Sequence, residues 1–153
     1  MAQKIYRLLF VDDELDAEPY LVIPFEDAGF EVDTATNGAD AEHAFRSGVK
    51  YDAIILDNMM APGEDPQGKW NFDVVKNGLH TGLLFLGMMA EACDSPPPVW
   101  VVTGFPDAEV ETKEREFAFV VDVIRKPHSL ELLAAEIIRY LSERGAGGDL
   151  ANA

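Results

Sequence analysis

The stretch IYRLLFVDDE, at residues 5–14, joins an apolar run directly to three acidic residues. Similar apolar runs, each bounded by polar or turn residues, follow at residues 53–56, 99–102 and 120–124. Short runs of this kind are typical of strands that are buried on both faces of a sheet. The stretch therefore predicts the first strand of a parallel sheet, with polar side chains where that strand ends.

Helical patterns lie between these runs. We expect helices at about residues 16–28, 39–45, 79–93 and 130–141, and a further strand at residues 30–34. The last helix has an apolar stripe with Ser129 as its N-cap, whereas Pro24 should kink the first helix or delay its start. Strands that alternate with helices in five units predict an α/β fold with a doubly wound, five-stranded parallel sheet.

The composition fits one globular domain, because 153 residues, 48% of them hydrophobic, can bury a core without disulfides. The net charge of −16, from 28 acidic and 12 basic residues, would repel a phosphate backbone, so we expect no direct nucleic-acid binding. Cys93 is the only cysteine, which excludes an internal disulfide and favours a reducing compartment. The N-terminus lacks a secretory signal and the longest apolar stretch, around residues 83–90, is too short for a bilayer, so we expect a cytoplasmic protein without membrane insertion.

Polar residues follow four of the predicted strands. In chain order they are Asp12-Asp13-Glu14, Asp57-Asn58-Met59, Thr103-Gly104 and Lys126-Pro127. Parallel α/β sheets place their sites at the carboxyl ends of the strands, so these residues meet in one cleft if the first, third, fourth and fifth strands are neighbours. Carboxylates at close range raise one another's pKa unless a cation lies among them, and Mg²⁺ prefers oxygen ligands of this kind.

These residues, in this order, resemble the receiver domains of bacterial two-component response regulators, over about residues 4–143. The resemblance implies a flavodoxin-like (βα)5 fold with strand order 2-1-3-4-5. It implies Asp57 as the phosphoacceptor and Mg²⁺ as the cofactor, with Asp12, Asp13, Asp57 and the backbone carbonyl of Met59 around the metal. It also implies that Lys126 pairs with the acceptor carboxylate or the phosphoryl oxygens, and that Thr103 binds a phosphoryl oxygen.

The function implied by the resemblance is a phosphorylation-dependent switch in a phosphorelay. A histidine kinase or phosphotransfer protein would supply the phosphoryl group, and a downstream effector protein would receive the signal. Such a domain assists its own phosphorylation and dephosphorylation and is not a turnover enzyme on an external substrate. We expect the receiver domain at residues 1–144, a disordered tail at 145–153 and no output domain within the chain; a homodimer stays open.

Two features depart from the family. Val123 stands where the family usually carries an aromatic residue, and Phe105 or Phe119 nearby is a candidate substitute. Residues 61–77 form a long insertion after the third strand, in which Trp70 and Phe72 supply large apolar side chains. These rings either cover the third helix within the molecule or form an interface with a dimer mate or another partner.

Other functions compete with this one. The missing aromatic residue and the insertion also fit a pseudo-receiver, a binding scaffold that is not phosphorylated. A flavin-binding electron carrier would need a phosphate loop in place of Asp12-Asp13-Glu14, and an aspartyl phosphatase usually carries a second Asp where Glu14 stands and needs a cap domain. The three histidines, His43, His80 and His128, lack a metal-ligand spacing, although His128 follows Lys126-Pro127 closely enough to reach the cleft rim.

Overall fold

The computed structural model describes residues 4–65, 67–71, 73, 75, 80–104 and 107–152. Five parallel strands form one sheet in the order β2-β1-β3-β4-β5. The strands are β1 (Arg7–Val11), β2 (Glu31–Ala35), β3 (Ala53–Leu56), β4 (Val99–Thr103) and β5 (Val120–Arg125). The predicted fold class and strand order are therefore confirmed.

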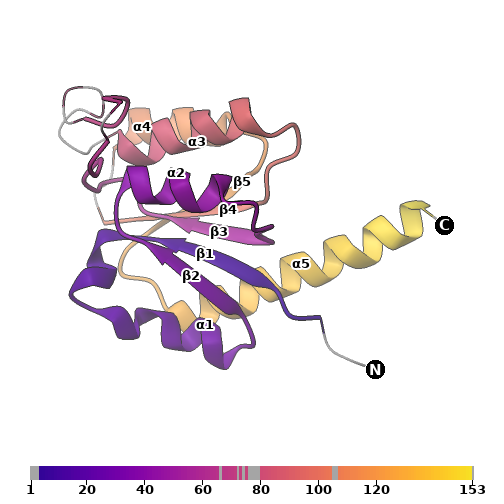
Figure 1. Cartoon of the computed structure of the whole chain (residues 1–153). Coiled ribbons are helices and arrows are strands. Elements are labelled where there is room, and N and C mark those ends of the chain that lie inside the picture. Colours follow the sequence, from indigo (N-terminus) through magenta and orange to yellow (C-terminus); the bar gives the residue numbers. More distant parts are fainter. Residues whose placement is uncertain are drawn as a thin grey trace.

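Helices cover both faces of the sheet (Figure 1). One layer contains α1 (Ile23–Asp27) and α5 (Leu130–Asn152), and the other contains α2 (Gly38–Arg46), α3 (Thr81–Ala92) and α4 (Ala108–Arg115). Side chains that alternate along each strand supply two separate cores: Leu9 and Val11 belong to the core beneath α2 and α3, and Leu8 and Phe10 to the core beneath α1 and α5. Burial on both sides explains why the strands read as continuous apolar runs.

The first helix starts late, as Pro24 predicts. The chain after β1 forms two 3₁₀ turns, at Asp13–Asp16 and Pro19–Val22, and α1 begins only at Ile23. Pro24 then lies in the first turn of α1, where the missing N–H costs no helical hydrogen bond.

The last two helices differ from what the sequence predicts. The five predicted units include a helix at α4, but the residue pattern did not locate it, because only Val110 and Glu114 of its eight residues are buried and it has no apolar stripe. α5 is capped at Ser129, whose Oγ accepts a hydrogen bond from the Leu132 N–H at 3.2 Å, but it continues to Asn152. The segment expected to be a disordered tail thus prolongs the helix, in which each added residue gains one backbone hydrogen bond.

Trp70 of the insertion packs inside the molecule and is 3% exposed. Its ring lies against the backbone of Gly38, where an added Cβ would come within 2.4 Å of ring atoms. The indole N–H donates to Glu42 Oε1 at 2.7 Å, and Glu42 also binds Lys69 and Arg46. The interpretation of Trp70 as intramolecular cover is confirmed, although the ring covers the start of α2; Phe72 lies outside the described residues.

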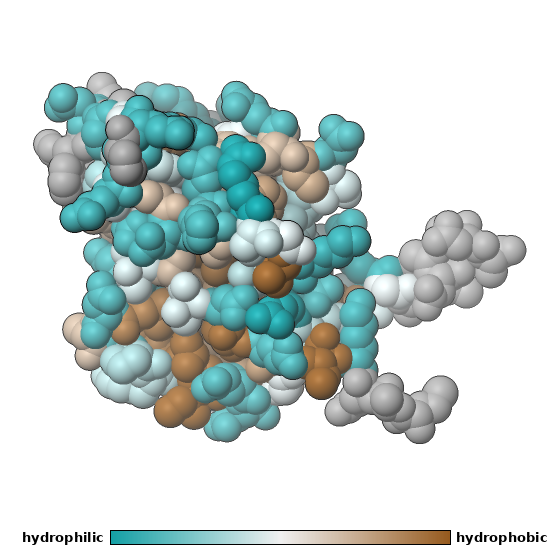
Figure 2. Space-filling view, viewed as in Figure 1, coloured by the Kyte–Doolittle hydropathy of each residue, from teal (hydrophilic) through white to brown (hydrophobic). Residues whose placement is uncertain are grey.

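Hydrophobic side chains are concentrated on one half of the visible surface, over α1, whereas the half over α2 is mostly hydrophilic (Figure 2). Ile23 of α1 is one of the exposed large hydrophobic residues. Within the part of the chain that the structure describes, no helix combines the length and apolar character that crossing a bilayer requires.

Candidate functional site

The register of the sheet places two acidic side chains next to each other. Val11 pairs with Leu56, so the following residues, Asp12 and Asp57, leave neighbouring strands at the same edge. The backbone N–H of Asp57 donates to the Val11 carbonyl at 2.9 Å, which holds the end of β3 against β1. Both carboxylates are buried, at 4% and 5% exposure.

Lys126 lies between these carboxylates. Its Nζ donates to Asp12 Oδ2 at 2.8 Å and lies 3.5 Å from Asp57 Oδ2 and 3.3 Å from Glu14 Oε1. The backbone holds the lysine there, because its N–H donates to the Thr103 carbonyl at 2.8 Å. A residue 114 positions from Asp12 thus completes the cluster.

Asp13 adds a third carboxylate at the solvent-facing side of the cluster. One oxygen from each of Asp12, Asp13 and Asp57 lies within 4.8 Å of the other two. Asp13 is exposed while the other two are buried, so the group opens toward solvent. Of the residues that the structure describes, these three form the His/Cys/Asp/Glu cluster with a geometry suitable for a metal ion.

The pKa values of the cluster show that its carboxylates are crowded. Burial and the neighbouring charge of Asp12 raise the pKa of Asp57 well above its ordinary value, despite the opposing effect of Lys126. Burial and Asp12 also raise the pKa of Asp13. For Lys126, burial by itself lowers the pKa, but the hydrogen bond to Asp12 and the charge of Asp57 outweigh burial and raise it. One ammonium therefore does not compensate the negative charge, and a divalent cation would be favoured there.

The remaining predicted residues lie around this cluster. Met59 follows Asp57 by two positions, and its N–H donates to Asp57 Oδ1 at 3.3 Å while its side chain is exposed. Thr103 is buried at the carboxyl end of β4. Gly104 lies beside the Lys126 side chain, where an added Cβ would be 3.7 Å from Cδ. The geometry brings these residues to one edge of the sheet, and their roles toward phosphate or metal stay predictions.

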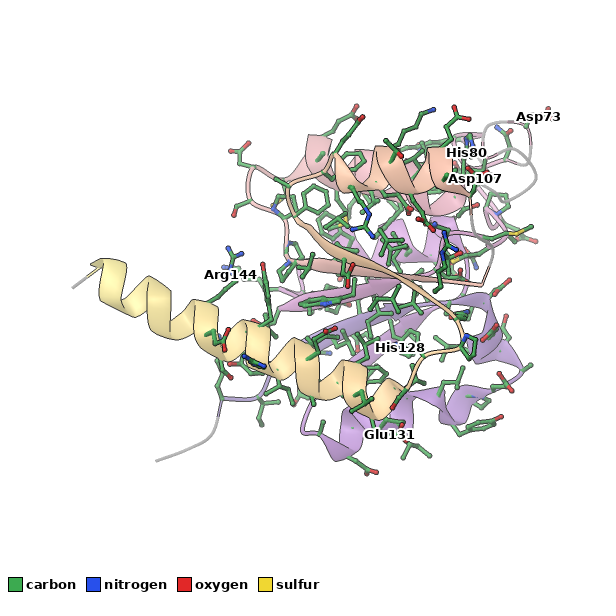
Figure 3. The ribbon with its side chains drawn as sticks, turned by 180° about the vertical axis from the view of Figure 1, so that it is seen from behind. Asp73, His80, Asp107, His128, Glu131 and Arg144 are labelled. Atoms are coloured by element: carbon green, nitrogen blue, oxygen red, sulfur yellow. The ribbon has the colours of Figure 1, made fainter. Side chains whose placement is uncertain are left out.

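A cavity of about 460 Å³ adjoins the cluster. Its polar lining includes Asp12, Glu14, Lys126 and His128, and Leu21 and Leu130 are among its apolar lining residues. His128 lies in the loop between β5 and α5, at the same end of the molecule as His80 and Asp107, which precede α3 and α4 (Figure 3). The expectation that His128 reaches the rim of the cleft is thus confirmed.

Sequence reasoning missed one polar contact beside the site. Asn58 Nδ2 donates to Glu114 Oε1 at 2.9 Å, and both side chains are buried. Burial raises the pKa of Glu114 to about 7, against the lowering effect of the hydrogen bond from Asn58. The signal available in the sequence was a glutamate four residues after Val110, which puts it on the buried side of a short charged helix.

The sequence resembles a curated bacterial regulator. The transcriptional regulatory protein CusR of Escherichia coli (strain K12) is 31% identical over 140 residues, which are 92% of this chain and 52% of that protein. The chain thus spans about half the length of the curated relatives it matches. No family model matches the chain.

Solved structures have the same fold. A CheY-like response regulator receiver domain protein from Methanospirillum hungatei JF-1 has a TM-score of 0.71 and 19% identity, over 94% of this chain and 99% of that chain. A response regulator protein from Burkholderia pseudomallei, with a phosphorylated aspartic acid, a calcium ion and citrate, has a TM-score of 0.62 and 19% identity, over 97% of this chain and 75% of that chain. At these identities the likeness concerns the fold.

Proposed function

We propose that this chain, which has the fold of response regulator receiver domains, is a phosphorylation-dependent signalling switch with Asp57 as the phosphoacceptor. The observation that carries the proposal is the meeting of Asp12, Asp57 and Lys126 at one edge of the sheet, with Lys126 Nζ at 2.8 Å and 3.5 Å from the two carboxylates. This arrangement joins a nucleophilic carboxylate to a fixed positive charge. The Burkholderia regulator with a phosphorylated aspartic acid supports this chemistry on the same fold.

The proposed reaction transfers a phosphoryl group from a phosphohistidine to Asp57. One oxygen of the Asp57 carboxylate forms a bond to phosphorus while the bond from phosphorus to the donor nitrogen breaks. The leaving imidazole nitrogen keeps the electron pair and takes up a proton. Asp57 must be ionised to attack, and Lys126 is placed to stabilise negative charge on the transferred group.

Mg²⁺ fits the donor set at this edge. Three carboxylates offer oxygens within 4.8 Å of one another, and the raised pKa of Asp57 shows that their charge is not fully compensated by protein groups. We assign Asp12, Asp13, Asp57 and the Met59 carbonyl as the residues that would hold the ion. When bound, the ion supplies positive charge that neutralises the carboxylates and the incoming phosphoryl oxygens.

The proposed partners are a histidine kinase or phosphotransfer protein as donor and an effector protein that reads the phosphorylated state. In this proposal Thr103 binds a phosphoryl oxygen, and its movement changes the surface near α4 and β5. In this proposal the domain assists its own phosphorylation and dephosphorylation and is not a turnover enzyme on an external substrate. The match covers only 52% of the curated relative, so the way in which the signal is passed on belongs to the proposal.

Intact-mass analysis after incubation with Mg²⁺ and acetyl phosphate tests the proposal. We expect one phosphoryl adduct on the wild type, no adduct without Mg²⁺ and no adduct on Asp57→Asn. Asp94→Asn is the matched control, because Asp94 is exposed in the loop between α3 and β4, before the amino end of β4.

An adduct that persists on Asp57→Asn would move the acceptor to another residue. If neither acetyl phosphate nor a panel of histidine kinases modifies the wild type, the chain is better described as an unphosphorylated scaffold.

A further inference from the structure

The contact between Asn58 and Glu114 lies next to the cluster but takes no part in the chemistry proposed above. Glu114 is 0% exposed and Asn58 is 4% exposed, so a helix that is otherwise mostly solvent-facing buries a carboxyl group against the residue after Asp57. A buried carboxyl group is costly unless it is hydrogen-bonded or neutral. Its placement therefore calls for an explanation beyond packing.

The hydrogen bonding of the pair is half complete. Asn58 Nδ2 donates to Glu114 Oε1 at 2.9 Å, while Asn58 Oδ1 and Glu114 Oε2 are buried without a hydrogen-bond partner. These two oxygens belong to the amide and the carboxyl group that the hydrogen bond already joins. A neutral Glu114 carries an acid proton, which is the kind of donor that an amide oxygen such as Asn58 Oδ1 accepts. A carboxyl group and an amide, each with one unpaired oxygen, are the groups that form an acid–amide pair.

Asn58 is also fixed from the side of α3. The Gly82 N–H donates to the Asn58 carbonyl at 3.1 Å. A Cβ on Gly82 would lie 2.8 Å from Asn58 Oδ1, 2.9 Å from Asn58 Cα and 3.1 Å from the Asp57 carbonyl. The short segment at residues 57–59 is thus held between the start of α3 and the buried side of α4.

α4 reaches the other side of the cluster as well. Glu111 Oε1 lies 3.4 Å from Nε of Arg125, the residue that precedes Lys126. One turn of α4 therefore contacts the residue after Asp57 and the residue before Lys126.

We propose that the Asn58–Glu114 pair is a positioning element that couples the segment carrying Asp57 and Met59 to the location of α4. Occupation of the site that moves residues 57–59 then moves α4, and displacement of α4 alters the site. Because such coupling is reciprocal, a ligand that changes the free energy of the pair must bind with a different affinity once the pair is removed. This inference rests on the proposed function, since it assigns the pair a role in transmitting site occupancy.

Three variants separate coupling from simple packing. Glu114→Gln keeps a group that can make both hydrogen bonds to Asn58, whereas Glu114→Met has similar volume and can make neither. Glu109→Met is the control, because Glu109 lies on the same helix with 81% side-chain exposure.

The first measurement is amide hydrogen exchange in metal-free protein. We expect Glu114→Met to speed exchange about tenfold in both residues 108–115 and residues 57–60, and Glu114→Gln and Glu109→Met to stay close to wild type. Faster exchange in α4 alone would overturn the inference, because the helix would then loosen without affecting the site.

The second measurement is Mg²⁺ affinity, by titration well below the melting temperature. Global destabilisation lowers the melting temperature but does not change the affinity of molecules that remain folded. We expect Glu114→Met and Asn58→Leu each to weaken Mg²⁺ binding about fivefold, and the double variant to weaken it no further. An unchanged Mg²⁺ affinity in the single variants, or additive losses in the double variant, would overturn the coupling.

The two measurements distinguish the two proposals. A wild type that binds no Mg²⁺ and forms no adduct refutes the proposed function, and the exchange experiment then decides alone whether Asn58 and Glu114 couple α4 to residues 57–60.

Discussion

Asp57 combines a nearby ammonium with a raised pKa. Lys126 Nζ is 3.5 Å from its carboxylate, and an isolated pair at that distance would lower the pKa. Burial and the adjacent Asp12 charge outweigh that pairing, and Lys126 makes its shorter contact, at 2.8 Å, with Asp12. The ionised residue that the proposed reaction needs is therefore a destabilising group in the metal-free fold.

Asp57→Asn should stabilise the metal-free protein at pH 8 by about 1 kcal/mol. The folded-state pKa of Asp57 is raised, so its stabilising protonated form is lost as the pH rises through that value, whereas Asn stays neutral. Urea unfolding at pH 8 and at pH 4 measures the effect, and the gain should shrink at pH 4. A gain at neither pH, or an equal gain in Asp94→Asn, would contradict this explanation.

Glu114 predicts a second pH dependence. Its pKa rises from 4.5 when unfolded to about 7 when folded, so the folded state binds more protons between these values and loses stability as the pH rises. The unfolding free energy of the wild type should fall by roughly 2 kcal/mol more between pH 5 and pH 8 than that of Glu114→Gln. Chemical unfolding across that range in both proteins is the measurement. Equal slopes would show that Glu114 does not titrate there.

At the scale of elements, the insertion packs closely against α2 because α2 has a glycine at the point of contact. Gly38 opens α2 and has Trp70 against it, and a side chain there would overlap the ring. Glu42, one turn further along, accepts from the indole N–H and from Lys69. Burial alone would raise the pKa of Glu42, but its hydrogen bonds to Lys69, Trp70 and Arg46 lower it to about 2.

Gly38→Ala should destabilise the protein by about 2 kcal/mol and shift the fluorescence of Trp70 toward that of a solvent-exposed indole. The added methyl group would lie 2.4 Å from the ring and would displace it. Gly87→Ala in α3 is the control, because a Cβ there meets no atom within 4 Å and should stabilise the helix by about 0.5–1 kcal/mol. Thermal melts with fluorescence detection compare the two, and equal tolerance of both changes would refute the proposed fit.

At the scale of the whole molecule, the sheet gathers charge that no single element could hold. Three strands supply the carboxylates and the lysine, and two helical layers bury the sheet beneath them. Apolar packing on both faces offsets the repulsion at the edge, in a chain whose net charge is already −16. A divalent cation would relieve that repulsion and stabilise the fold as a whole.

Mg²⁺ should raise the unfolding free energy by mass action, by about 2.7 kcal/mol at a concentration 100 times the dissociation constant. The effect should be lost in Asp13→Asn, since Asp13 is the exposed member of the carboxylate cluster. Asp16→Asn is the control, as Asp16 is exposed in the same 3₁₀ turn. A melting temperature that does not respond to Mg²⁺ in the wild type would exclude the assigned metal site.

The sequence by itself determined the strands of the sheet and the polar strand ends, and its resemblance to receiver domains implied the strand order. Strands such as Ala53–Leu56 are buried on both faces, so their composition reveals them without knowledge of their neighbours. The polar residues that follow them meet because parallel strands end at one edge. With the strand order that the resemblance implies, that geometry places Asp12, Asp57 and Lys126 together.

Only the tertiary structure decided the features that depend on contacts between distant segments. α4 has almost no apolar pattern, since it is held by capping at Asp107, by Val110 and by a buried glutamate. Asn58, the partner of Glu114, is 56 residues away in the sequence, and Gly38 lies 32 residues before the Trp70 ring that packs against it. Local periodicity reports which face of an element is buried, but it carries no information about which atom of another element lies opposite, and that is what fixes hydrogen-bonded pairs and close ring contacts.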